Sequence, residues 1–146
     1  MFIYFGIGTN LGNREANIRE ALRLLDNLIG KQLACSSIYR SAPQGFKSDN
    51  EFANIVVVYE TTYSPEEVLL ITQQIECDMG RTHKSVNGIY HDRIIDIDLL
   101  QAYTIVDGEL SMITCQQSNL ALPHPRIYER DFVFIPLREV ENREYW

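Results

Sequence analysis

The residues best suited to chemistry in this sequence are two aspartates, Asp96 and Asp98, separated by a single isoleucine. They lie in the apolar segment 93–100, which predicts a β-strand. Because alternate residues of a strand share a face, both carboxylates should project together while the apolar residues face the core. Adjacent carboxylates repel each other unless a cation lies between them, and Mg²⁺ is a hard cation that prefers oxygen ligands. Asp-x-Asp on its own is more often a solvated strand face, so the neighbouring charges decide between the two interpretations.

Basic residues flank the acidic strand on both sides. They are Arg81, His83, Lys84, His91 and Arg93 before or at its start, and His124, Arg126 and Arg130 after it. Each one alone is usually a solvated surface charge. In a chain with a formal net charge of −7, however, their gathering around a carboxylate pair favours a metal–polyphosphate complex. Metal ions bridge phosphate oxygens, and basic side chains neutralise the remaining charge. His124 is further constrained, because it stands between two prolines that restrict the backbone.

Composition and charge set the class of protein. The chain has 146 residues, of which 45% are hydrophobic and 23% charged, and we expect one globular domain over 1–146. The negative net charge argues against broad nucleic-acid binding. Its three widely spaced cysteines predict reduced thiols, and no stretch predicts a leader or a membrane span. We therefore expect a cytoplasmic protein without a membrane or nucleic-acid partner, and the sequence is compatible with a monomer.

Hydrophobic periodicity predicts the elements that must position these residues. Strands are expected at 2–8, 31–40, 52–61 and 93–102, helices at 14–29 and 65–79, a hairpin at 104–112, a short helical turn at 123–128 and an apolar strand segment at 132–137. Ser64 and Glu67 form a predicted capping box at the start of the second helix. The order β-α-β-β-α-β with a C-terminal extension is typical of a ferredoxin-like α+β sandwich. Such a fold hosts many functions and does not decide among them.

Two further segments have less specific patterns. The glycine-rich segment 6–12 fits neither the Rossmann nor the P-loop pattern, so we interpret it as a tight strand-to-helix turn. Phe52, Asn54, Phe132 and the loop beginning at Ser41 could frame a flat aromatic ligand, because an amide both donates and accepts hydrogen bonds. On pattern alone, both phenylalanines are more simply explained as core residues.

Taken together, these motifs resemble those of the 6-hydroxymethyl-7,8-dihydropterin pyrophosphokinase family. The matching segments are Gly8–Gly12, Tyr39–Gly45, Phe52–Asn54, Ile75-Glu76, Gly80-Arg81, Arg93–Leu100, Leu122–Arg126, Arg130–Val133 and Pro136-Leu137. They cover nearly the whole chain in order, and the acidic strand followed by Pro-His-Pro-Arg is the most specific part. The resemblance implies a folate-pathway enzyme that transfers a pyrophosphoryl group from Mg-ATP to 6-hydroxymethyl-7,8-dihydropterin and releases AMP.

The resemblance also implies a role for each candidate residue. Asp96 and Asp98 would hold two Mg²⁺ ions, and with Arg81 and Arg93 they would form the catalytic set. The ATP site would comprise Gln73, Glu76, Arg81, His83, Tyr90, Arg93, His124 and Arg130. The pterin site would comprise Ser41, Ala42, Pro43, Gln44, Gly45, Phe52, Asn54 and Phe132, with the ring stacked between the two phenylalanines. No protein nucleophile is implied, so catalysis would rest on positioning and electrostatics.

Two alternatives stay open. RNA-recognition modules share the β-α-β-β-α-β order, but they usually present a basic surface rather than Asp-x-Asp. A catalytically weakened nucleotide-binding relative is the second alternative. His83 and His91-Asp92 stand where family members often carry arginine and Gly-Pro, and Tyr90 stands where some carry tryptophan. A magnesium-dependent assay with the pterin and ATP separates both from the enzyme.

Overall fold

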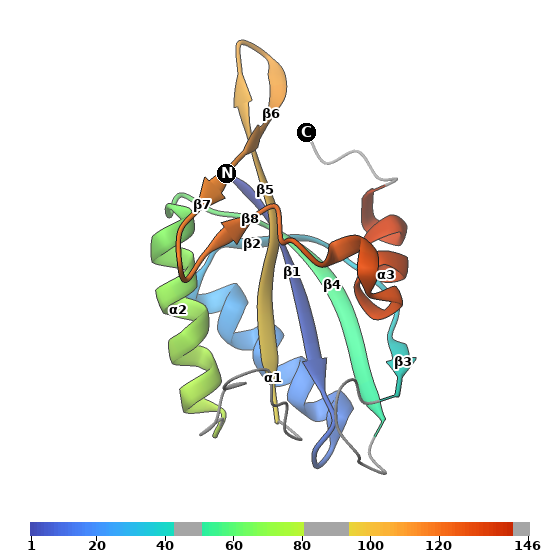
Figure 1. Ribbon diagram of the computed structural model, residues 1–146. Helices are drawn as coiled ribbons and strands as arrows, with labels where there is room; N and C mark the ends of the chain where they lie inside the picture. Colours follow the sequence, from blue (N-terminus) through green and yellow to red (C-terminus); the bar gives the residue numbers. More distant parts are fainter. Residues whose placement is uncertain (43–50, 81–93, 142–146) are drawn as a thin grey trace.

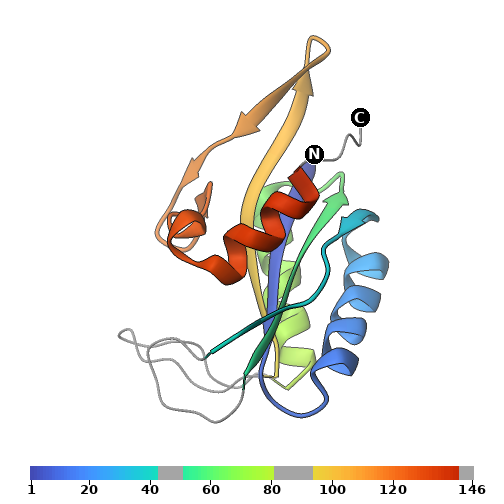
Figure 2. The same cartoon turned by 90° about the vertical axis from the view of Figure 1, so that its right-hand side faces the viewer.

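The computed structural model describes residues 1–42, 51–80 and 94–141 of the chain. They form an antiparallel sheet with two helices on one face and a third helix on the other (Figures 1 and 2). The strands of the main sheet follow the order β2-β4-β1-β5-β6, and β3 pairs with β4 beside β2. Their bounds are β1 Phe2–Thr9, β2 Lys31–Cys35, β3 Tyr39–Ser41, β4 Phe52–Glu60, β5 Asp96–Val106 and β6 Glu109–Ile113. The predicted mixed class, with helices packed on an antiparallel sheet, is thus confirmed, but the third helix was not predicted.

Helices α1 (Arg14–Leu28) and α2 (Pro65–Asp78) cover the first face of the sheet. Their buried apolar residues pack on the odd-numbered residues of β1 and β4 and on part of β5. The predicted capping box of α2 is confirmed, since Ser64 accepts from the Glu67 backbone N–H and the Glu67 carboxylate accepts from that of Ser64. The first face therefore forms the larger core of the protein.

Helix α3 (Asp131–Glu141) crosses the second face (Figure 2). Val133, Leu137 and Val140 recur at helical spacing and are buried against Val56 and Leu100. Our prediction of a strand at 132–137 was wrong. A short apolar run does not distinguish a strand from a buried helix, and the position of the next buried residue, Val140, was the signal that favoured the helix.

The segment 31–40 was predicted as one strand, but it forms two, β2 and β3. The interruption lies at two serines, of which Ser36 bonds through its side chain to the main chain and Ser37 bonds to the Glu139 carboxylate. The Ser36 hydroxyl donates to the Ser37 carbonyl and accepts from the Val56 N–H, while the Ser37 N–H donates to Glu139 of α3. Serine side chains compete for backbone groups in this way, and here they end the regular ladder.

The glycine-rich segment 6–12 is not one tight turn as predicted. Gly6 and Gly8 lie within β1, and only Gly12, with a φ of 67°, adopts a turn conformation. The predicted hairpin is confirmed, because Asp107 and Gly108 both have positive φ and join β5 to β6.

The remaining C-terminal segment places residues near the acidic strand. Strands β7 (Cys115–Gln116) and β8 (Ala121–Leu122) pair with each other in front of α2 and β5, and a 3-10 turn, η1 (Ile127–Glu129), leads into α3 (Figure 1). The helical turn predicted at 123–128 therefore begins later than expected. Within residues 1–42, 51–80 and 94–141, no helix is long and apolar enough to cross a membrane.

Candidate active site

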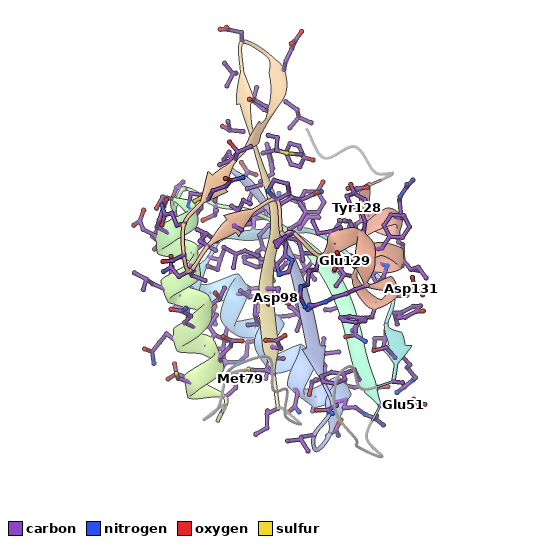
Figure 3. All side chains as sticks on the ribbon, in the orientation of Figure 1. Glu51, Met79, Asp98, Tyr128, Glu129 and Asp131 are labelled. Carbon is purple, nitrogen blue, oxygen red and sulfur yellow. The ribbon has the colours of Figure 1, made fainter. Side chains whose placement is uncertain are left out.

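Asp96 and Asp98 lie on the second face of the sheet, outside the apolar cluster beneath α3. Asp98 lies on β5 between α2 and the segment containing η1 and α3 (Figure 3). In the sheet register, Asp96 pairs with Gly8 and Asp98 pairs with Gly6, while on the other side of β1 Gly8 pairs with Asn54. Directly paired residues project to the same face. Asn54, Gly8 and Asp96 therefore form one row across three strands.

Asp96 and Asp98 are both partly exposed, whereas Ile97 between them is 5% exposed. The alternation predicted for this strand is therefore confirmed. Among the described residues, no group of three or more His, Cys, Asp or Glu side chains gathers in a metal-binding arrangement. Two carboxylates still fit Mg²⁺, which is usually held by one or two carboxylates and completes its shell with water and substrate phosphates.

A cavity of about 440 Å³ opens beside this strand. It is lined by residues of α2, β5, the β7–β8 segment and the stretch before α3. Six of the predicted residues line it, namely Gln73, Glu76, Asp96, Asp98, His124 and Arg130. The structure thus brings together the acidic pair and the described part of the predicted nucleotide site.

Glu76 joins the cavity to the edge of β5. Its side chain is 3% exposed, and its carboxylate accepts a 3.0 Å hydrogen bond from the Ile97 backbone N–H. Strand β6 pairs only with the upper part of β5, from Ala102 onward. The carboxylate of Glu76 therefore satisfies a strand N–H that lies between the two aspartates and fixes this edge against α2.

His124 is positioned by an irregularity in β5. The register between β1 and β5 shifts at Tyr4/Phe5, and Leu100 is the extra residue of the resulting bulge. The Leu100 carbonyl accepts a 2.7 Å hydrogen bond from the His124 N–H. The His124 Nδ1 in turn accepts from the Arg126 N–H at 3.1 Å, which leaves Nε2 to carry the proton of the neutral ring.

The charge state of His124 follows from its surroundings. Burial lowers its pKa from the ordinary value of 6.5, the positive charges of Arg130 and Arg126 lower it further, and Asp96 opposes them. These surroundings therefore favour a neutral imidazole with a donor at Nε2. Arg130 lies 5.7 Å from the centre of the Phe132 ring, so the cationic side of the cavity reaches the start of α3.

Those residues predicted to bind the pterin that the structure describes do not line this cavity; they lie on or directly after β3, on β4 and on α3. The Asn54 amide nitrogen donates to the Tyr39 carbonyl at 3.0 Å and to the Ser41 hydroxyl at 2.8 Å. Phe52 pairs with Ser41, and Ala42 follows β3 directly. Phe132 is partly buried at the start of α3, against the smaller core.

Several predicted residues lie outside the described part of the chain. They are Pro43, Gln44, Gly45, Arg81, His83, Tyr90 and Arg93. The cavity also includes residues that the sequence did not indicate, chiefly Leu69, Thr72 and the segment 117–121. The helical spacing of Leu69, Thr72, Gln73 and Glu76 on α2 was a usable signal. The β7–β8 segment had none, because strands of two residues are too short to show periodicity.

The sequence matches the family model described as 7,8-dihydro-6-hydroxymethylpterin-pyrophosphokinase (HPPK) over residues 4–142. A Porphyromonas gingivalis protein named 2-amino-4-hydroxy-6-hydroxymethyldihydropteridine pyrophosphokinase is 41% identical over 140 residues, covering 94% of this chain and 89% of the relative. A Bacillus subtilis protein of the same name is 36% identical over 138 residues, covering 94% of this chain and 76% of the relative.

Solved structures share the fold. A crystal structure of HPPK-DHPS in complex with substrates superposes with a TM-score of 0.66 at 17% identity, covering 95% of this chain. Wild-type Plasmodium falciparum HPPK-DHPS with pteroate gives a TM-score of 0.65 at 17% identity and covers 94%. This chain spans 40% and 38% of those two longer chains, respectively.

Proposed function

Because this chain belongs to the 7,8-dihydro-6-hydroxymethylpterin-pyrophosphokinase family, we propose that the row formed by Asn54, Gly8 and Asp96 and the adjoining cavity are its active site. The chain is a folate-biosynthesis enzyme that transfers pyrophosphate from ATP to 6-hydroxymethyl-7,8-dihydropterin. The observation that supports the site most directly is the shared face of Asp96 and Asp98 at the mouth of a cavity that also contains His124 and Arg130.

ATP occupies the cavity beside β5 in this proposal. Gln73 and Glu76 line its α2 side, and His124 and Arg130 its opposite side. The neutral His124 ring offers its Nε2 proton, and the Arg130 guanidinium offers charge to a phosphate oxygen. Arg81, His83, Tyr90 and Arg93, which precede β5 in the sequence, are proposed to complete the nucleotide site.

Two Mg²⁺ ions are proposed at Asp96 and Asp98. Bound there by the two carboxylates, they would neutralise the charge of the ATP phosphates. The chain's own contribution is to hold both carboxylates on one face. Strand alternation does this, and the Glu76–Ile97 hydrogen bond fixes the strand between them.

The pterin is proposed to lie on the other side of β1. Phe52 and Phe132 would stack on the ring, and Asn54 would read its edge, with Ser41 to Gly45 beside it. The substrate hydroxyl oxygen forms a bond to the β-phosphorus. The bond from the β-phosphorus to the oxygen that bridges to the α-phosphate breaks, and AMP leaves with the bonding electrons. The hydroxyl proton is released to water. We assign to Arg81 and Arg93 the stabilisation of the negative charge on the transferred phosphates. The reaction needs no protein nucleophile.

We also propose a detailed topology, a cellular location and an oligomeric state. The antiparallel strand order β2-β4-β1-β5, with α1 and α2 on one face, supports a ferredoxin-like arrangement within a single domain. An RNA-recognition module with this arrangement would need aromatic and basic residues where this chain carries Asp96 and Asp98. We propose that the enzyme is cytoplasmic and monomeric and has no nucleic-acid partner.

A magnesium-dependent assay tests the function. The purified chain is incubated with 6-hydroxymethyl-7,8-dihydropterin, ATP and Mg²⁺, and AMP and the pterin diphosphate are measured. We expect both products in equal amounts and none when Mg²⁺ is chelated. Binding of both ligands without turnover would indicate the weakened relative, and absence of pterin binding would refute the proposed function.

A further inference from the structure

We propose that Gly8 enables pterin binding by keeping the floor between Asn54 and Asp96 free of any side chain. This inference rests on the proposed placement of the pterin, and it gives a role to a glycine that the turn interpretation had left unexplained. Gly8 lies in the interior of β1 and pairs with Asn54 on one side and with Asp96 on the other. It is therefore the middle residue of the row that joins the two halves of the site.

The row matches what the reaction requires of its substrate. Neighbouring strands lie roughly 4.7–4.9 Å apart, so the outer two backbones of the row are separated by roughly 9–10 Å. The pterin ring must reach the Asn54 side while its hydroxymethyl group approaches phosphates held near Asp96. A substrate that makes both contacts passes over Gly8, and a side chain at that position would stand in its path.

The structure shows a steric reason for glycine at this position. A Cβ built on Gly8 would lie 3.0 Å from the Asn54 Oδ1 atom and 3.6 Å from Cδ1 of the Phe52 ring. The first separation is shorter than an ordinary contact, so Asn54 would have to move. Gly8 is not among the residues with positive φ, and its backbone is thus compatible with alanine. The constraint is the space above the strand, not the backbone conformation.

The Asn54 side chain is held in place and cannot easily move away from a new methyl group on residue 8. Its amide nitrogen donates two hydrogen bonds, to the Tyr39 carbonyl and the Ser41 hydroxyl, and its side chain is 4% exposed. Moving the amide oxygen away from a new methyl group therefore strains or breaks these bonds. Because Asn54 and Phe52 are both assigned to the pterin, the displacement should act on pterin recognition and spare the nucleotide cavity.

Gly6 provides a matched control on the same strand and face. The three atoms nearest to its added Cβ all belong to the Leu100 side chain, at 3.4–3.7 Å, which is ordinary van der Waals contact. Gly6→Ala and Gly8→Ala thus make the same chemical change two residues apart. Alanine is also no worse than glycine within a strand, so neither variant should lose folding stability through backbone propensity.

The experiment measures pterin and ATP binding separately for both variants. Calorimetry with pterin in the presence of a non-hydrolysable Mg-ATP analogue gives the first affinity, and titration with the analogue alone gives the second. We expect Gly8→Ala to weaken pterin binding about tenfold or more, because displacement of a positioning group by a fraction of an ångström is costly. Analogue binding should stay unchanged in Gly8→Ala, and Gly6→Ala should match the wild type for both ligands.

A double-mutant cycle tests the mechanism. In an Asn54→Ala background the oxygen that the new methyl group would meet is absent, so adding Gly8→Ala should weaken pterin binding much less than in the wild type. Equal pterin affinity of Gly8→Ala and Gly6→Ala, or equal loss of both ligands in Gly8→Ala, would overturn the inference. If the wild type itself fails to bind pterin, the proposed function fails instead, so the two failures are distinguishable.

Discussion

The second face of the sheet has two halves built from the same three strands. In the covered half, Val56, Val58 and Leu100 are at most 1% exposed beneath α3. In the open half, Asn54 and Asp96 continue the same face with polar side chains, and neither belongs to the apolar cluster beneath α3. One sheet thus supplies both a core and a site, and the difference between them lies in what covers each half.

Helix α3 sets the boundary between the halves. Its buried residues extend from Val133 to Val140, and Gln101 donates a 3.0 Å hydrogen bond to Glu141 at its end. At its beginning, Arg130 and Phe132 border the open half. The arrangement predicts that substitutions in the covered half change stability, whereas substitutions in the open half change ligand binding and turnover.

Replacing Asp98 by asparagine should cause the largest effect. The change keeps the shape of the side chain but removes a charge assigned to Mg²⁺, a loss worth several kcal/mol in the transition state. We expect turnover to fall by about a thousandfold or more. Thermal stability without Mg²⁺ should be unchanged or higher, because a repulsion between neighbouring carboxylates is removed. Glu109→Gln on the exposed strand β6 removes the same charge and should leave both properties near wild type.

Steady-state rates over a range of Mg²⁺ concentrations provide the measurement. If Asp98→Asn keeps more than a tenth of the wild-type rate at saturating Mg²⁺, or is impaired no more than Glu109→Gln, the metal role assigned to the open half is wrong.

Replacing Leu137 by alanine should produce the largest effect in the covered half. Leu137 is 1% exposed on the buried side of α3, and removing its methyl groups should lower the free energy of unfolding by about 2–5 kcal/mol. Ile135, on the same helix, is 46% exposed, and Ile135→Ala should cost roughly 0.5 kcal/mol or less. Urea unfolding gives both values. Similar losses in the two variants would contradict the packing of α3 on the sheet.

The sequence predicted the open half better than the helix that bounds it. Strand alternation was sufficient to place Asp96 and Asp98 on one face, because this periodicity is local. The helical state of 132–137 was indicated only by Val140, which lies beyond the apolar run. The serine interruption after β2 depends on tertiary contacts, such as those of Ser37 with Glu139. These contacts join residues about a hundred positions apart, which no local pattern encodes.

The same reasoning explains which site residues could be assigned and which could not. The acidic pair and His124 stand in short motifs whose chemistry is recognisable. The β7–β8 segment lines the cavity only because the chain folds back over α2. The importance of Gly8 likewise depends on pairing with two strands that are distant in sequence. Motifs therefore indicate chemistry well, whereas the shape of the cavity requires the fold.

Phe132 lies at the boundary between the halves. Its replacement therefore distinguishes a role in pterin stacking from a role in core packing. Phe132→Ala should weaken pterin binding roughly tenfold, since a lost aromatic stack costs about 1 kcal/mol beyond the area buried. Binding of the Mg-ATP analogue should change little. Phe134→Ala removes a ring from the same helix that contacts Tyr128 and Arg138 instead, and it serves as the control. An equal loss of both ligands in Phe132→Ala would show that Phe132 is a core residue only.

The smallest expected effect concerns the pH dependence of stability at His124. Its pKa in the folded state is lowered by burial and by Arg130 and Arg126, whereas the unfolded chain should have a value near 6.5. Below that pH the unfolded state binds more protons than the folded state, so protonation favours unfolding. The contribution of the neutral ring is fully present above pH 6.5 and is lost as the pH falls through the lowered folded value. In His124→Gln this dependence should disappear, and the stability difference between wild type and variant should shift against the wild type as the medium becomes more acidic. Urea unfolding without Mg²⁺ or nucleotide, at several pH values on both sides of 6.5, measures it. A wild type that gains stability relative to His124→Gln on acidification would mean that a carboxylate, and not the arginines, controls this ring.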